Sequence, residues 1–309
     1  MSIATLGIDT SNYTTSLSVC VDGTVTENVK IPLPVAEGAA GLRQSDAVFA
    51  HTKNLPDAFD RLKTDLKNIS AVGFSSRPRN ADGSYMPCFL SGAAAARAVC
   101  KALNATEYAF SHQEGHIRAA IYSSRMPYYE EFYAYHLSGG TFELLDVKAD
   151  GRGYKTEIAG GTLDVTAGQI IDRAGVMLGL SFPCGAELEK LAKENKEKIT
   201  DVKTCVNGAY CNLSGLQNKA EKLYKDGRPR AYIAAYVIET VRRTLDKMTE
   251  NALKEKKLPL LFSGGVASNS ILKEYFNGKY GAYFAEPAFS ADNAAGIALL
   301  TYERFKDEK

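Results

Sequence analysis

Two segments of this chain, EFYAYHLSGG at residues 131–140 and LPLLFSGG at residues 258–265, share one form. Each is an apolar run rich in β-forming residues that ends abruptly in Ser-Gly-Gly, which predicts a strand feeding a glycine turn. The bare backbone N–H groups of such a turn can approach an anion. A related edge, GIDTS at residues 7–11, lies near the start of the chain. Because ligands of α/β folds bind outside the carboxyl ends of strands, three such edges predict one cleft between two lobes.

Helical patterns alternate with the strands. Residues 45–66 have helical spacing, with Pro56 marking a new helix start or a kink. Long amphipathic helices are predicted at residues 164–180 and 228–255, and a closing helix at residues 291–305 has Asp292 in its first turn. Neither a tandem repeat nor a low-complexity linker interrupts the pattern. It therefore favours an α/β protein with two interleaved lobes.

Composition excludes some classes of protein. The 37 Lys and Arg residues nearly balance the 36 Asp and Glu residues, so the overall charge of +1 gives no general argument for nucleic-acid binding. Neither a signal peptide nor an apolar run of about 18 residues is apparent, so we expect no membrane association. Six scattered cysteines without a C-x-x-C pair predict reduced thiols and a cytoplasmic protein.

The segment SHQEGHIRAA at residues 111–120 is a candidate metal site. On a helix, His112 and His116 are four residues apart, so both imidazoles project from one face and can share a cation. A third ligand is needed, and Asp292 is the candidate. The alternative is a pair of histidines making ordinary hydrogen bonds. A zinc protease motif is disfavoured, because its general base directly follows the first histidine and Gln113 cannot serve as a base.

Two acids lie at the end of the glycine-rich stretch AGGTLD and just after it. Asp164 and Asp172 are eight residues apart, so on one helix they share a face and could bind ribose hydroxyls. The alternative is that such acids are solvated or cap a helix.

Together these stretches resemble the universal tRNA threonylcarbamoyladenosine transferase family, called TsaD in bacteria and earlier known as glycoprotease or peptidase family M22. The motifs occur in family order: GIDTS, SHQEGHI, HLSGGTFEL, AGQIIDRAGVMLGLSFPCG, LSGL, FSGGVASNSILK and SADNAAGIA. The resemblance implies the two-lobed actin/Hsp70/sugar-kinase (ASKHA, actin-like ATPase) fold with an interlobe cleft. We expect residues 1–125 and the C-terminal helix 290–309 to form one lobe and residues 126–289 the other.

The resemblance also implies roles for individual residues. One divalent metal ion (iron, zinc or manganese) is implied at His112, His116 and Asp292. An adenine nucleotide or adenylate is implied at six positions. These are Ser138, Gly139, Gly140, Asp172, Gly185 and Asn269. The resemblance assigns no catalytic side chain, and Asp9 and Ser11 of the GIDTS edge are candidates.

The implied reaction transfers a threonylcarbamoyl group from threonylcarbamoyl-adenylate to N6 of adenosine 37 in tRNA. The implied partners are tRNA and TsaB/TsaE-like proteins, and a homodimer or a heterodimer would both be compatible with the family. Three alternatives stay open. They are a divergent carbamoyl or acyl transferase with another acceptor, a non-catalytic nucleotide-binding partner subunit and, least favoured, an endopeptidase.

Several positions depart from the family pattern. Acids and small or polar residues of the family motifs are replaced at nine positions, namely Tyr13, Thr14, Arg77, Arg79, Thr141, Phe142, Val165, Gln169 and Gln217. The metal residues persist while polar residues of other motifs do not. This pattern predicts a divergent paralog whose acceptor or chemistry has changed, because loss of a general base lowers the rate by orders of magnitude.

Overall fold

The computed structural model describes residues 2–11, 13–34, 42–151 and 153–309, so Asn12 of the GIDTSNYTT segment lies outside the described residues. The chain divides into two compact units. The first unit comprises residues 1–123, 149–155 and 288–309, and the second comprises residues 124–148 and 156–287.

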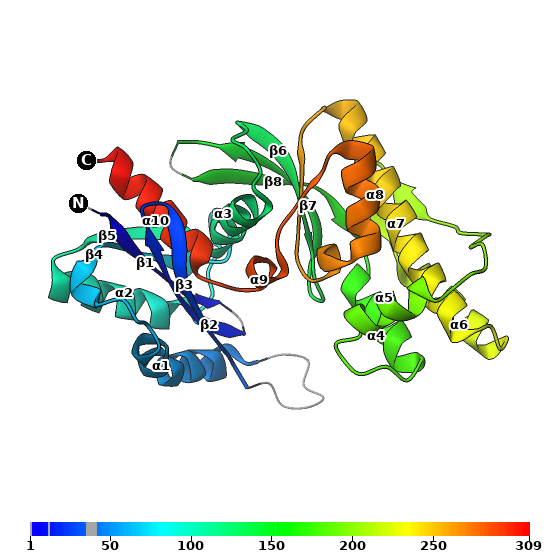
Figure 1. Ribbon diagram of the computed structural model, residues 1–309, viewed down its shortest axis with the longest axis horizontal. Coiled ribbons are helices and arrows are strands. Elements are labelled where there is room, and N and C mark those ends of the chain that lie inside the picture. Colours follow the sequence, from blue (N-terminus) through cyan, green and yellow to red (C-terminus); the bar gives the residue numbers. More distant parts are fainter. Residues whose placement is uncertain (1, 12, 35–41, 152) are drawn as a thin grey trace. The chain divides into compact units, whose positions relative to one another are not determined.

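The first unit is built on a five-stranded sheet in the order β3-β2-β1-β4-β5 (Figure 1). Its strands are β1 Ala4–Ser11, β2 Thr14–Val21, β3 Thr24–Pro32, β4 Ile69–Arg77 and β5 Thr106–Ser111. The first three strands form an antiparallel meander, whereas β4 runs parallel to both β1 and β5. In the turn between β2 and β3, Asp22 and Gly23 both have positive φ.

Helices cover both faces of this sheet. The helices of the unit are α1 Gln44–Asp60, α2 Phe89–Leu103, α3 His112–Ser124, α9 Pro287–Ser290 and α10 Ala295–Asp307, with a 3₁₀ turn at Leu66–Asn68. Thr10 of β1 bonds the Cys88 carbonyl beside α2, and Thr5 of the same strand bonds the Ala298 carbonyl of α10. Residues an odd number apart in a strand face opposite sides, so α2 and α10 lie on opposite faces.

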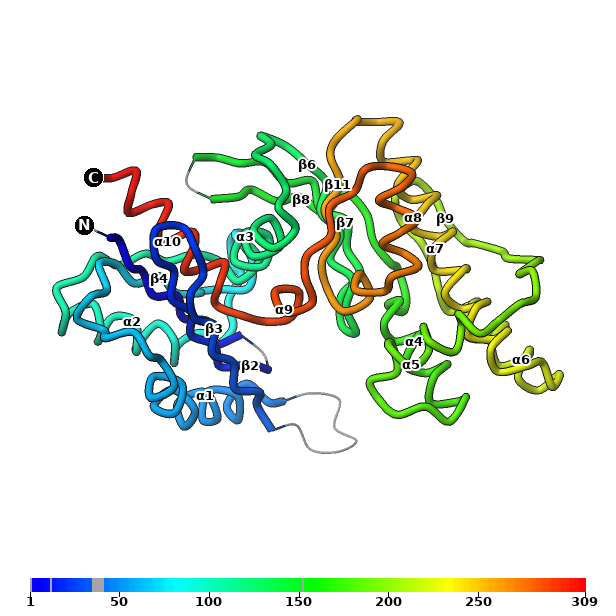
Figure 2. Tube along the Cα trace, in the orientation of Figure 1, coloured from blue at the N-terminus to red at the C-terminus, as the bar shows by residue number. Residues whose placement is uncertain are grey.

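Helix α10 lies against β1, although the two elements come from opposite ends of the chain (Figure 2). Gly7 permits this contact, since a Cβ there would lie 2.5 Å from the Ala294 carbonyl oxygen. Helix α3 meets α10 in the same way, because a Cβ on Gly296 would collide with the Gly115 carbonyl. Glycine at position 296 therefore allows the backbones of α3 and α10 to lie close together.

The second unit is built on a seven-stranded sheet in the order β12-β11-β6-β7-β8-β10-β9. Its strands are β6 Glu131–Leu137, β7 Phe142–Ala149, β8 Tyr154–Thr162, β9 Cys205–Asn207, β10 Tyr210–Asn212, β11 Leu260–Ser263 and β12 Tyr283–Phe284. Because β6 and β11 are parallel, with His136 opposite Ser263, the two Ser-Gly-Gly turns begin at the same edge of the sheet. Gly264 has φ +95°, and a Cβ there would collide with the Leu137 carbonyl.

Helices complete the core of the second unit. They are α4 Ala167–Met177, α5 Gly185–Lys193, α6 Ser214–Lys225, α7 Arg230–Glu255 and α8 Ser270–Tyr280, with a 3₁₀ turn at Val266–Ser268. Rings from neighbouring strands stack in the interior, with centroids 4.7 Å apart for Tyr135–Phe262 and for Phe262–Phe284. Among the described residues, no helix is long and apolar enough to cross a membrane, and all six cysteines are free.

Two local predictions were wrong. Asp292 precedes α10 instead of lying in its first turn, whereas Pro56 lies inside helix α1 and does not start a new helix. Asp164 does not share a helix with Asp172, because α4 begins at Ala167 after its N-cap Thr166. Asp164 instead accepts hydrogen bonds from the Leu213 and Ser214 amides at the start of α6, so it is a capping acid.

Candidate functional site

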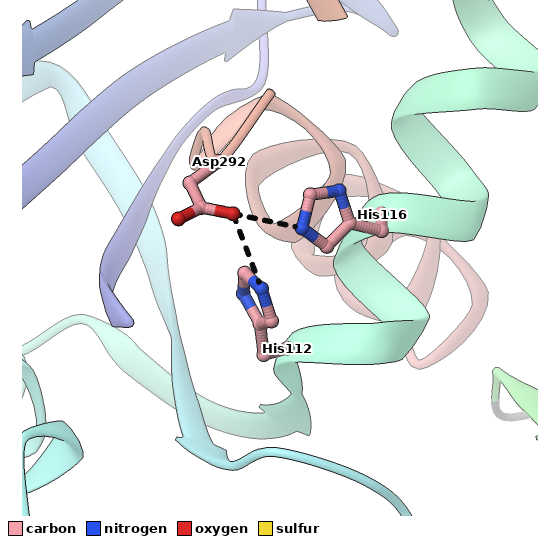
Figure 3. Close-up of side chains that lie close together, drawn as sticks. All are labelled: His112, His116 and Asp292. Atoms are coloured by element: carbon pink, nitrogen blue, oxygen red, sulfur yellow. Dashed lines mark hydrogen bonds and ion pairs between the residues drawn. The ribbon is translucent and has the colours of Figure 1, made fainter. Parts of the chain in front are cut away.

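The three predicted metal residues lie together in the first unit. His112 and His116 occupy the first and second turns of α3, and Asp292 lies in the loop before α10 (Figure 3). Oδ1 of Asp292 is 3.2 Å from Nε2 of His116 and 3.6 Å from Nε2 of His112. One candidate ligand atom from each residue lies within 4.8 Å of the other two.

Asp9, a candidate catalytic residue, contacts the cluster from β1. Its Oδ2 is 2.7 Å from Nδ1 of His112, and its Oδ1 accepts from the Ser11 amide. A carboxylate that holds one imidazole nitrogen as a donor leaves the other nitrogen as an acceptor, which is how metal-binding histidines are oriented. Ser11, the other candidate, is 1% exposed, and its hydroxyl has no hydrogen-bond partner within the described part of the chain.

Burial and neighbouring charges shift the pKa values of His112 and Asp292 in the cluster. Burial alone would lower the pKa of His112, but the carboxylates of Asp9 and Asp292 raise it to about 10. Burial disfavours the charged form of Asp292, yet hydrogen bonds from His112 and His116 hold its pKa well below the usual range. The site therefore stabilises a positive charge between the imidazoles and the carboxylate. A bound cation would replace the proton there.

The donor set fits a divalent transition metal. Two imidazole nitrogens and one carboxylate oxygen suit iron, zinc and manganese almost equally, and they leave coordination positions open for a substrate. The three side chains are partly buried, with 16% exposure for His112, 9% for His116 and 26% for Asp292. A ligand can therefore still reach the cluster from solvent.

A pocket of about 360 Å³ lies in the second unit. Its walls come from the Ser-Gly-Gly turns, the first turns of α4 and α5, and the loop before α8. The lining residues are Gly139, Gly168, Ile171, Asp172, Pro183, Gly185, Ala186, Glu189, Gly265, Val266, Ser268 and Asn269. Backbone N–H groups at the starts of helices attract anions, so this wall suits a phosphate.

Four of the six predicted nucleotide residues line this pocket, and Ser138 and Gly140 do not. Ser138 instead closes its own turn, because its amide donates to the Thr141 carbonyl and its hydroxyl accepts from the Thr141 amide. Thr166 extends this arrangement by donating to the Gly139 carbonyl. The first Ser-Gly-Gly turn is thus a rigid loop that presents Gly139 to the pocket.

The polar pocket residues also hold the surrounding helices. Asp172 accepts from the Cys184 amide at 2.8 Å, just before α5. Asn269 caps α8 by accepting from the amides of residues 271 and 272, which leaves its amide nitrogen to meet a ligand. Glu189 accepts from the Ser270 amide and hydroxyl. Glu189 was not predicted as a site residue. Its spacing of four from Gly185 places both on one helix face, but spacing alone does not indicate its contact with Ser270.

Several departures from the family pattern have structural roles. Phe142 is 3% exposed in the core, and Val165 packs against the same core. Gln169 completes a capping box with Thr166, a role that Gln and Glu share. Gln217 accepts from Arg173 and donates to Glu221, so it joins α4 to α6. These four replacements lie outside the lining of the pocket.

Other departures lie beside the metal cluster. Arg77, at the end of β4, is paired in register with Ser111, the residue before His112. Its guanidinium donates to Asn80, and the Gln113 amide donates to the Pro78 carbonyl. This loop therefore contacts the start of α3, the helix that carries His112 and His116.

Comparison with known proteins gives a consistent family match. The family model described as TsaD, tRNA N6-adenosine threonylcarbamoyltransferase, matches residues 40–299. A tRNA N6-adenosine threonylcarbamoyltransferase of Thermus thermophilus is 33% identical over 97% of this chain and 92% of its own.

Solved structures show the fold. Component A of (R)-2-hydroxyglutaryl-CoA dehydratase from Acidaminococcus fermentans matches with a TM-score of 0.57 at 14% identity, covering 98% of each chain. A ROK family glucokinase from Streptomyces griseus matches with a TM-score of 0.51 at 12% identity, covering 97% of this chain and 98% of its own. The predicted α/β actin-like ATPase fold, with two lobes, is therefore confirmed.

Proposed function

The chain belongs to the TsaD family of tRNA N6-adenosine threonylcarbamoyltransferases, and from this premise we propose that it carries out the family's reaction. The proposed reaction joins the N6 amine of adenosine 37 in tRNA to the carbamoyl carbon of threonylcarbamoyl-adenylate. The bond from that carbon to the phosphate oxygen breaks, AMP leaves, and N6 loses one proton. The observation that carries the proposal is the convergence of His112, His116 and Asp292.

In this proposal the metal cluster acts on the reacting carbonyl. A divalent ion held by His112, His116 and Asp292 would polarise the carbonyl or stabilise the charge that develops on it. Asp9 keeps the His112 ring in the orientation that directs Nε2 toward the cluster. Asp9 is therefore a positioning residue, and we assign no proton transfer to it.

The pocket of the second unit holds the adenylate in this proposal. Gly139 and the first turns of α4 and α5 provide N–H groups for the phosphate. Asp172 would accept from ribose hydroxyls, and the Asn269 amide would contact the adenine. Gly185 leaves room for the nucleotide, since a Cβ there would meet nothing within 4 Å.

We also propose that tRNA and TsaB/TsaE-like proteins are the partners, which places the protein in the cytoplasm. A second candidate function is transfer to an acceptor other than tRNA. It is favoured by Arg77, which is paired with Ser111 at a position where the resemblance implies a small residue.

A reconstitution assay tests the proposal. The purified protein, a divalent metal, threonylcarbamoyl-adenylate and the partner proteins are incubated with unmodified tRNA, and the nucleosides are measured by mass spectrometry. Threonylcarbamoyladenosine should accumulate, and His116→Ala should abolish it. Adenylate consumption without modified tRNA would favour another acceptor, and absence of both would contradict the proposal.

A further inference from the structure

Glu114 is a buried acid in the middle of the metal-site segment. Its side chain lies on α3 between the two histidines in sequence, and the residue is 6% exposed. A buried carboxylate is costly unless hydrogen bonds compensate for its lost hydration. Each of its two oxygens accepts hydrogen bonds from the chain, and the two oxygens contact different segments.

The first oxygen caps the helix that carries the histidines. Oε2 accepts from the Ser111 amide at 2.8 Å and from the Ser111 hydroxyl at 2.7 Å. The Ser111 hydroxyl oxygen in turn accepts a hydrogen bond from the Glu114 amide, at 3.2 Å. This reciprocal Ser-x-x-Glu arrangement is a capping box, and it makes His112 the first residue of the helix.

The second oxygen contacts a turn distant in sequence. Oε1 accepts from the Tyr154 amide at 3.4 Å, at the start of β8 and within residues 149–155 of the first unit. Gly153 makes this approach possible, because a Cβ there would collide with Oε1 of Glu114. The turn is closed by the Asp150 amide, which donates to the Gly153 carbonyl. The first turn of α3 is therefore fixed to a second part of the fold.

We infer that Glu114 is a positioning residue for metal binding, since it fixes the turn from which His112 and His116 reach Asp292. The inference rests on the proposed metal site and assigns Glu114 no contact with substrate or metal. Glu114 could suggest the general base of a protease, but its carboxylate instead accepts hydrogen bonds from the backbone amides of Ser111 and Tyr154. Groups that orient metal ligands without binding the metal typically change metal affinity about 10–100-fold.

The test measures Co²⁺ affinity, with visible absorption as a report of ligand geometry. Glu114→Ala should weaken binding by at least about 10-fold and alter the absorption. Glu114→Gln should retain most of the affinity, because Gln also completes a capping box. Gly153→Ala, far from the ligands in sequence, should weaken binding because its methyl group displaces the carboxylate.

Glu303→Gln is the matched control for stability. Glu303 of α10 accepts from Arg118, which lies beyond the first turn of the same helix α3, at 2.8 Å and 2.6 Å. This variant should lower the melting temperature and leave Co²⁺ affinity within about twofold of wild type. Loss of a group that orients the metal ligands should instead lower Co²⁺ affinity by at least about 10-fold. Should Glu114→Ala fail to fold, Glu114→Gln and Gly153→Ala still decide the question.

The outcomes distinguish failure of the role inferred for Glu114 from failure of the proposed metal site. Wild-type affinity in Glu114→Ala or Gly153→Ala would overturn the role of Glu114 and leave the metal site intact. A loss no larger than that of Glu303→Gln at equal melting temperature would overturn it too. If wild type bound no Co²⁺, or if His116→Ala bound it equally well, the proposed metal site would fail and the inference with it.

Discussion

The proposed metal cluster of the first unit and the proposed nucleotide pocket of the second unit are built in different ways. The cluster consists of ionisable side chains whose hydrogen bonds orient one another, as Asp9 does for His112. Four of the twelve residues that line the pocket are glycines, and the starts of helices form part of its walls. The first site depends on residue identity, whereas the second depends on space and on the direction of N–H groups.

This difference determines how each site should respond to change. In the cluster, removal of one polar atom leaves a buried partner uncompensated. In the pocket, by contrast, atoms added at the glycines would occupy the ligand's volume. The following predictions test this contrast.

The largest effect should come from the metal ligands. His116→Ala or Asp292→Ala leaves two of the three proposed ligands. Metal affinity should therefore fall by more than about 100-fold, which exceeds the loss expected when only a group that orients a ligand is removed. Metal analysis after dialysis against a weak chelator measures it, with Glu303→Gln as the control that keeps the metal. Equal metal content in His116→Ala and wild type would show that the cation binds elsewhere.

Gly264→Ala should strongly destabilise the second unit. The residue has φ +95°, and its Cβ would collide with the Leu137 carbonyl, so we expect a loss of about 1–3 kcal/mol in the free energy of unfolding. Urea denaturation measures this loss. Gly265→Ala is the matched control, because a Cβ at Gly265 would meet nothing within 4 Å. Equal losses in the two variants would contradict the role given to Gly264.

Acid should destabilise the first unit through His51. This histidine is fully buried on α1, with Nδ1 2.9 Å from the Thr15 hydroxyl, and Nε2 has no hydrogen-bond partner among the described residues. Burial lowers the pKa of His51 from 6.5 to about 4, although Asp9 and Asp292 oppose the shift. The unfolded chain therefore binds the proton more readily. The stabilisation is fully present above pH 6.5 and is lost as the pH falls toward 4.

Between about pH 7.5 and pH 5, this loss should amount to roughly 2 kcal/mol. The measurement is urea denaturation at both pH values for wild type and for His51→Gln, whose side chain does not titrate. The variant should show the smaller pH dependence, and an identical dependence in both proteins would exclude His51 as the cause.

The smallest effect should come from Gly185→Val. A side chain at this position points to open space in the pocket, so it should reduce adenylate affinity by about 10-fold, or roughly 1.4 kcal/mol, with little change in unfolding. Calorimetric titration with a non-hydrolysable adenylate measures it. Unchanged affinity would mean that the nucleotide does not occupy this pocket.

Sequence reasoning identified the elements that have strong periodicity or abrupt glycine ends. Both Ser-Gly-Gly turns follow strands, and α3 presents His112 and His116 one turn apart. It could not locate Glu189, because nothing in the sequence indicates that α5 and α8 meet. Asp164 was misassigned because the helix start at Thr166 depends on a capping box with Gln169. Pairings across the chain, such as Asp9 with His112, follow from sheet order and not from local pattern.

The most direct test of the central claim is the metal dependence of transfer. Metal-stripped protein is titrated with a divalent ion, and transfer of isotope-labelled threonylcarbamoyl groups to tRNA is measured with the partner proteins present. Transfer should rise with the bound metal and reach its plateau at about one ion per chain, the stoichiometry of a single three-ligand site. Full transfer by the metal-stripped protein or by His116→Ala would contradict the account.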